Sequence, residues 1–90
     1  MKLIFCPECS DVVKGNSKPR ECLCGASGIQ YLDDLRAFYW GLAVPLGFCN
    51  RSLLEAIQQQ PATGRGRHFT AFVIAEDCAT FEKYSDYDKG

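Results

Sequence analysis

The feature that most constrains this chain is a set of four cysteines within its first 24 residues. They form two close pairs, Cys6 with Cys9 and Cys22 with Cys24, with twelve residues between the pairs. Two thiol pairs in tight turns, joined by a short polar segment, are typical ligands of one tetrahedral zinc ion. Because four thiolates leave no coordination position for water or substrate, we expect a structural zinc rather than a catalytic one.

A disulfide framework is the alternative interpretation of these cysteines. Six cysteines in 90 residues is an even and high count, as in small secreted domains. Against it, residues 1–5 are far too short for an export signal, and Cys49 and Cys78 stand alone in the sequence. The chain also lacks the run of about 18 apolar residues that a membrane span needs. We therefore expect zinc, a cytoplasmic location and no membrane contact.

Length and charge narrow the possible functions. Ninety residues make one small domain, whose core is marginal without a staple such as zinc. The formal net charge is −1, and four thiolates with one zinc ion bring it to about −3. An acidic total argues against strong binding to long duplex nucleic acid, which needs many cationic contacts with phosphates. A small cationic pocket remains compatible with this charge.

The chain divides into three segments inside that single domain. Residues 1–27 form the zinc-binding unit, residues 28–81 the sheet and helix, and residues 82–90 a polar tail. Each boundary follows a change in composition, from cysteine-rich to apolar and then to acidic.

Strand patterns dominate the middle segment. Residues 29–32 and 35–44 are predicted strands, the second with alternating apolar residues, and a helix over 33–43 is the alternative. Pro45 and Gly47 are expected to end the second element, because proline lacks an amide donor and glycine favours turns.

One helix and one further strand are predicted in the second half of the chain. Ser52 and Glu55 have the spacing of a capping box, which predicts a helix over 52–60 that Pro61 ends. The apolar run 69–75 predicts the strongest strand, central in its sheet. The expected fold class is α+β: an N-terminal zinc ribbon or knuckle fused to a small, mainly antiparallel sheet with one helix.

Four motifs are spread over most of the chain. They read CPEC at 6–9, RxCxCGxSG at 20–28, AVPLGFxNxS at 43–52 and FTAFVI at 69–74. Together they resemble small uncharacterised zinc-ribbon proteins of bacteria and their phages. The resemblance implies a role in phage–host conflict and, for a phage-encoded chain, the host cytoplasm. It carries over no activity and no functional residue.

A glycine-rich cationic loop is the main candidate for ligand binding. Gly64, Arg65, Gly66, Arg67 and His68 place two guanidinium groups, an imidazole and flexible backbone amides within five residues. Guanidinium groups offer paired donors that match phosphate oxygens, and glycine lets the backbone approach an anion closely. The loop predicts a site for a phosphate group, and the alternative is a solvated charged loop.

Three further residues are predicted to contribute to a nucleotide site. Tyr39 and Trp40 lie on opposite faces of their predicted strand, so one ring would stack on a base if that face meets the loop. The alternative is that both rings belong to the core. Arg51, at the start of the predicted helix, is a further cation for an anionic ligand.

The two isolated cysteines are not predicted to be catalytic. Cys49 and Cys78 are expected to be small buried apolar residues. Cys49, near Arg51, is the better candidate for a reactive thiol, with His68 as its base, but nothing in the sequence brings the two together. The chain has no Ser/His/Asp order, paired carboxylates or Walker loop, so we expect no enzyme, and a hydrolase is a minor alternative.

The sequence favours non-catalytic binding of a phosphate-bearing ligand, such as a signalling nucleotide. The alternative is a protein-interaction module or a stoichiometric inhibitor of a host protein, whose contacts would be exposed aromatic residues and the acidic segment 76–88. A short nucleic-acid element is a less favoured ligand. Small sheets with apolar strands often dimerise, so a homo-oligomer is also compatible with the sequence.

Overall fold

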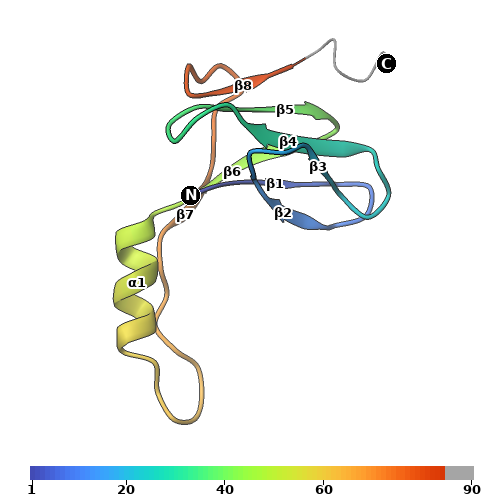
Figure 1. Cartoon of the computed structure of the whole chain (residues 1–90). Helices are drawn as coiled ribbons and strands as arrows, with labels where there is room; N and C mark the ends of the chain where they lie inside the picture. The colour runs from blue at the N-terminus through green and yellow to red at the C-terminus, as the bar shows by residue number, and fades with distance from the viewer. Residues whose placement is uncertain (85–90) are drawn as a thin grey trace.

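The computed structural model describes residues 1–84, which form eight strands and one helix (Figure 1). In chain order the elements are β1 (Lys2–Phe5), β2 (Val12–Lys14), β3 (Arg20–Glu21), β4 (Ser27–Tyr31), β5 (Ala37–Gly41), β6 (Val44–Phe48), α1 (Asn50–Gln58), β7 (Ala71–Val73) and β8 (Phe81–Lys83). The strands form two sheets, ordered β2-β1-β6-β7 and β3-β4-β5-β8. Neighbouring strands are antiparallel except β5 and β8. The α+β class, with mainly antiparallel strands and one helix, is confirmed, although the strands divide between two sheets.

The two sheets enclose a small core. Its buried side chains include Ile4 of β1, Ile29 of β4, Tyr39 of β5 and Phe81 of β8. The rings of Tyr39 and Phe81 meet edge to face with centroids 5.2 Å apart, a favourable arrangement of two aromatic quadrupoles. Cys6 is fully buried in the same cluster, so the first cysteine pair is anchored directly in the core.

A tight turn divides what the sequence predicts as one strand over 35–44. Gly41 has a φ of +72°, a conformation that favours glycine, and the Leu42 amide donates to the Ala26 carbonyl at 3.0 Å. The chain therefore reverses after β5 and starts again in β6. The prediction of a single strand is wrong here, and so is the alternative helix over 33–43.

β6 contains the two residues that are predicted to end a strand. Pro45 lacks an amide donor, but its carbonyl accepts from the Ile74 amide at 2.9 Å. Gly47 leaves room for the Phe72 ring, whose nearest atom would lie 2.6 Å from a Cβ at that position. The prediction is wrong because pairing with β1 on one side and β7 on the other holds this segment extended.

The apolar run 69–75 forms only a short edge strand. β7 pairs with β6 alone and exposes Ala71, Phe72 and Val73 to solvent. The prediction of a long central strand is wrong. An apolar run shows which side chains avoid water, but it does not show which part of the molecule covers them.

α1 begins two residues earlier than predicted and is capped differently. Cys49 occupies the N-cap position and makes no side-chain hydrogen bond there. The Ser52 hydroxyl donates to the Cys49 carbonyl at 3.2 Å and accepts from the Thr70 amide at 2.8 Å. The predicted capping box is wrong, because Ser52 already lies in the first turn of the helix.

Residues 50–70 form an arm that projects away from both sheets (Figure 1). α1 leads outward from β6, and residues 59–70 return beside it to β7. No helix in the described part of the chain combines the length and apolar character that a bilayer crossing requires. Of the predicted polar tail, residues 82–83 belong to β8, and residues 85–90 lie outside the described residues.

Candidate metal centre and binding surfaces

Two tight turns bring four thiols together. Cys6 and Cys9 lie in the turn after β1, and Cys22 and Cys24 lie in the turn between β3 and β4. Their four Sγ atoms lie within 4.8 Å of one another. Cys24 Sγ is 3.8 Å from Cys6 Sγ and 3.6 Å from Cys22 Sγ. Four sulfurs about 2.3 Å from a tetrahedral zinc would stand about 3.8 Å apart, so the donor set fits a metal ion.

Backbone hydrogen bonds shape both turns. The Ser10 amide donates to the Cys6 carbonyl at 2.7 Å, and the Gly25 amide donates to the Cys22 carbonyl at 3.1 Å. Gly25 has a φ of +79°, which lets the one-residue gap in the second pair turn back towards the first. The Leu23 amide donates to Asp11 Oδ2 at 3.0 Å and joins the two turns. All six cysteines are free, so no disulfide competes for these sulfurs.

The pKa values of two thiols in this cluster shift in opposite directions. The neighbouring Ser27 hydroxyl is the main influence on Cys6 and lowers the pKa of its thiol to about 6. At Cys24 the Ala26 backbone acts to lower the pKa, but burial and the neighbouring thiols outweigh it and raise the pKa to about 12. Four thiolates at this spacing require a cation to offset their repulsion, and a divalent metal ion supplies one.

Ser27 is a supporting residue that the sequence does not single out. Its Oγ is fully buried and forms no hydrogen bond among residues 1–84. Its hydroxyl nevertheless lowers the pKa of the Cys6 thiol more than any other group does. A metal-bound thiolate is a strong acceptor for such a donor. A metal at the four thiols would therefore satisfy a hydroxyl that is otherwise costly to bury.

The two isolated cysteines are half-buried rather than fully buried. The nearby Ser52 backbone lowers the pKa of Cys49, and the Thr80 side chain lowers that of Cys78. No hydrogen bond joins Cys49 to His68 within the described residues. The structure gives no support to the nucleophile–base pair that the sequence allows.

The cationic loop lies at the far end of the arm (Figure 1). Gly64, Arg65, Gly66, Arg67 and His68 are all exposed, and Gly64 has a φ of +81°. Within residues 1–84, the side chains of the two arginines and the histidine make neither an ion pair nor a hydrogen bond. The loop is therefore free to meet an external group.

The aromatic residues predicted to accompany the loop lie elsewhere. Tyr39 and Trp40 are only 2% and 3% exposed, in β5 of the second sheet. Tyr39 packs on Phe81, and Trp40 covers Gly28 of the neighbouring β4. Of the predicted ligand residues, Arg51 is on the arm with the loop, whereas the rings of Tyr39 and Trp40 are buried.

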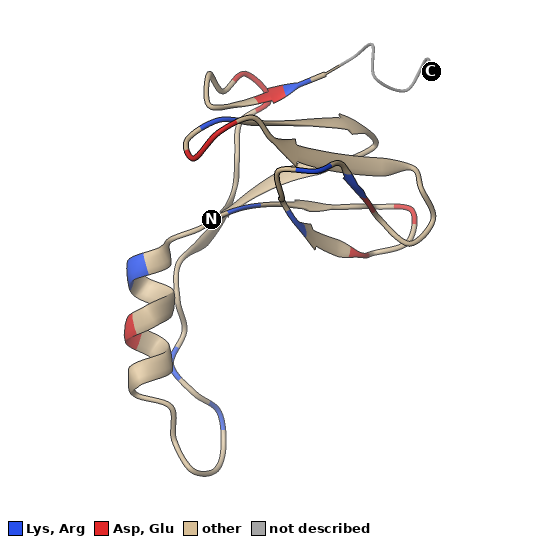
Figure 2. Cartoon of the chain, in the orientation of Figure 1, with Lys and Arg blue, Asp and Glu red and all other residues tan. Residues whose placement is uncertain are grey.

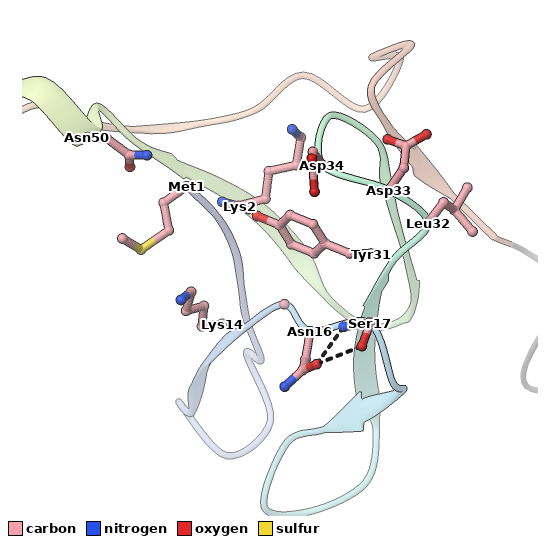
Figure 3. Close-up of a pocket in the computed structure, with 11 residues that line it drawn as sticks. Met1, Lys2, Lys14, Asn16, Ser17, Tyr31, Leu32, Asp33, Asp34 and Asn50 are labelled. Atoms are coloured by element: carbon pink, nitrogen blue, oxygen red, sulfur yellow. Dashed lines mark hydrogen bonds between the residues drawn. The ribbon is translucent and has the colours of Figure 1, made fainter.

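A cleft that the sequence does not indicate lies among the ends of β1, β2, β4 and the start of α1 (Figure 3). Its volume is about 590 Å³, and Lys2, Lys14, Tyr31 and Asn50 line it. Lys2 Nζ donates to the Leu35 carbonyl at 2.8 Å, whereas the Lys14 ammonium has no partner among residues 1–84. Because the lining comes from four separate segments, no local motif could reveal the cleft.

Comparison of the chain with protein families, with curated proteins and with solved structures finds no match.

Proposed function

We propose that this protein is a non-catalytic binding protein, stapled by zinc, that docks a polypeptide partner on its arm. The observation that carries the proposal is that no residue of α1 is buried against the described part of the chain. An isolated helix of nine residues is marginal in water, because its nucleation is costly and its own hydrogen bonds barely compensate. Such a helix gains its stability by packing its apolar side on another surface.

Large apolar side chains are exposed along the arm and at its base. They are Leu54, Ile57, Phe69, Phe72 and Val73. At roughly 200 Å² for a side chain of this size, their exposed fractions amount to about 500 Å² of surface. The largest apolar patch on a typical monomer is about 300–600 Å² and often functional. The arm and its base together reach this range on a small chain.

Charge specifies the chemistry of the partner. The arm carries Arg51, Arg65 and Arg67 against the single carboxylate of Glu55, so three positive charges and one negative charge give +2 with a neutral histidine. None of these groups forms an ion pair within residues 1–84. The surface that fits the arm is therefore apolar and bordered by carboxylates.

Zinc is the metal that fits the four thiols best. Tetrahedral thiolate sites in proteins hold zinc or iron, and a single zinc ion needs no redox partner. Cys6 follows β1 of the first sheet, and Cys24 precedes β4 of the second, so one ion would tie the two sheets together. This role is structural, and it leaves the arm as the surface that acts.

Site-specific photo-cross-linking tests the docking proposal. A photoreactive amino acid at position 57 is expected to give a discrete polypeptide adduct in bacterial cells, and the adduct should be lost when Leu54→Asp is added. The matched control places the same group at Leu23, which is 86% exposed on a zinc-binding turn. Absence of an adduct from position 57, or equal adducts from both positions, would contradict docking on the arm.

The resemblance to phage and bacterial zinc ribbons suggests what such docking would achieve. A phage-encoded arm that covers a functional surface of a host protein would be a stoichiometric inhibitor. Identification of the cross-linked polypeptide by mass spectrometry tests this finer proposal.

A phosphate-bearing small ligand is the second candidate, and the cleft beside Tyr31 is the observation that favours it. Its volume is within the range of small-molecule sites, and Lys14 offers an ammonium that has no partner among residues 1–84. Calorimetric titration with a panel of nucleotides should give heat that Lys14→Glu abolishes and that Lys18→Glu, a control charge reversal on an exposed loop, retains. Equal heats from both variants, or no heat from the native chain, would exclude the cleft.

A further inference from the structure

The end of the molecule opposite the arm carries the complementary charge (Figure 2). Glu76, Asp77 and Glu82 are exposed there with Lys83, so three negative charges and one positive charge give −2. These four side chains border a shallow cleft of about 290 Å³. None of them forms an ion pair with another described residue. An acidic site of this kind matches the unpaired arginines of the arm.

An apolar groove adjoins that acidic cleft. It has a volume of about 290 Å³, and its lining includes Ala43, Pro45, Val73 and Ile74. Glu76 and Lys83 border both hollows. The groove is apolar, and the adjoining cleft adds an excess of carboxylates, so together they match the exposed leucine and isoleucine of α1 and the neighbouring arginines.

The two complementary surfaces cannot meet within one chain. The tip of the arm and the segment 76–83 lie at opposite ends of the molecule (Figures 1 and 2), whose longest dimension is 48 Å. A contact between the arm and the acidic end would therefore have to join two chains. Because each chain carries one arm and one acidic end, a two-fold arrangement satisfies both contacts at once and closes without a free end.

We propose that the polypeptide that covers the arm is a second copy of this chain, in a dimer that exchanges arms. This inference rests on the proposed function, which makes the arm a docking surface, and it names the occupant. In the dimer, Leu54 and Ile57 of one chain pack on the apolar groove of the other. Arg65 and Arg67 lie against the carboxylates of the segment 76–82.

The exposed apolar side chains of the arm itself, Leu54, Ile57 and Phe69, amount to about 300 Å². A two-fold dimer covers two such arms, so these side chains contribute about 600 Å² of the roughly 1,600 Å² that a standard interface buries. The remainder would come from the polar side chains of the arm and from the groove and cleft. The small net charge of −1 on the chain before metal binding opposes self-association only weakly.

Charge-reversal complementation tests the exchange. The double variants Arg65→Glu/Arg67→Glu and Glu76→Arg/Asp77→Arg each place like charges in both contacts, so each alone should dimerise at least about a hundredfold more weakly than the native chain. Mixed together they should form a heterodimer. The reversed arm of one variant then faces the reversed acidic end of the other, and the native arm faces the native acidic end. Lys18→Glu is the control reversal on an exposed loop. Sedimentation equilibrium of the metal-loaded chains measures all five samples: the native chain, the two double variants, their mixture and the control.

The outcomes separate this inference from the proposed function. A native chain that stays monomeric at all concentrations overturns the dimer, and a cross-link from position 57 to another polypeptide then leaves the docking function standing. A native dimer that neither charge reversal weakens places the contact elsewhere and overturns the exchange. Recovery of the heterodimer from two monomeric variants supports the exchange, because two independently misfolded variants would not restore each other.

Discussion

The two sheets and the arm differ in how they are stabilised, although they belong to one short chain. The sheets bury Ile4, Ile29 and Phe81 completely and meet at four thiols. α1 buries no residue of its own against the described part of the chain. The sheets thus carry their stability internally, while the arm depends on a surface outside it. Under the docking proposal, folding depends on the sheets and binding depends on the arm.

Metal removal is the most severe test of the internal stability of the sheets. Cys22→Ser, or chelation of the metal, should unfold both sheets. Structural zinc in small domains contributes about 10–16 kcal/mol, whereas a chain of this size has about 5–13 kcal/mol in total. Circular dichroism and zinc stoichiometry measure the loss. Cys49→Ser is the matched control and should keep both metal and fold; a folded, metal-free Cys22→Ser chain would contradict the structural role.

A pair of identical substitutions compares the two regions directly. Ile4→Ala should lower the free energy of unfolding by about 2–5 kcal/mol, because it leaves a cavity in the core. Ile57→Ala, measured where the chain is monomeric, should change it by less than about 0.5 kcal/mol. Denaturant titration followed by the fluorescence of the buried Trp40 reports both values. Similar losses in the two variants would show that the arm packs on its own chain.

Two glycines in the same backbone conformation sharpen the comparison further. Gly25 and Gly64 have φ values of +79° and +81°, and a Cβ at either position meets nothing within 4 Å. Gly25→Ala should cost about 1–2 kcal/mol from backbone strain alone, because a metal at the four thiols would hold that turn in place. Gly64→Ala should leave the thermal midpoint unchanged, because the loop relaxes freely. Equal shifts in calorimetry would mean that the loop is as constrained as the turn.

The pH dependence of metal retention tests the contribution of Ser27. The folded pKa of Cys6, about 6, lies below its ordinary value of 9.0, so the stabilisation from its thiolate is complete above pH 9 and is lost as the pH falls towards 6. Ser27→Ala removes the main lowering influence, and the midpoint of zinc release should rise by up to about one pH unit. A chromogenic chelator follows the release. Ser17→Ala is the control, and coincident midpoints would rule out the role of Ser27.

Local sequence signals account for the parts of the molecule that depend on near neighbours. The four cysteines are brought together as their spacing predicts, because each pair lies within one turn. The predicted strand 29–32 corresponds to β4, and Pro61 follows the helix closely, as expected. These features depend on local backbone preference and on a metal geometry that few spacings satisfy.

The parts that were not predictable depend on contacts between distant segments. Pro45 is held in β6 by pairing with β1 and β7, and no local rule indicates two such neighbours. The capping-box pattern at Ser52 fails because the Thr70 amide, eighteen residues away, engages that hydroxyl. The cleft beside Tyr31 is assembled from four segments. In each case the partner lies beyond the range of a sequence window.

The amino-acid order was enough to establish a four-thiol centre, a small α+β chain and a cationic loop, because thiol spacing, turn residues and local charge act within a few residues. Only the folded arrangement decided that Tyr39 and Trp40 belong to the core, that Ser27 is buried where its hydroxyl influences the Cys6 thiol, and that the loop stands on a projecting arm. These outcomes follow from which surfaces bury one another, and burial is a property of the whole chain.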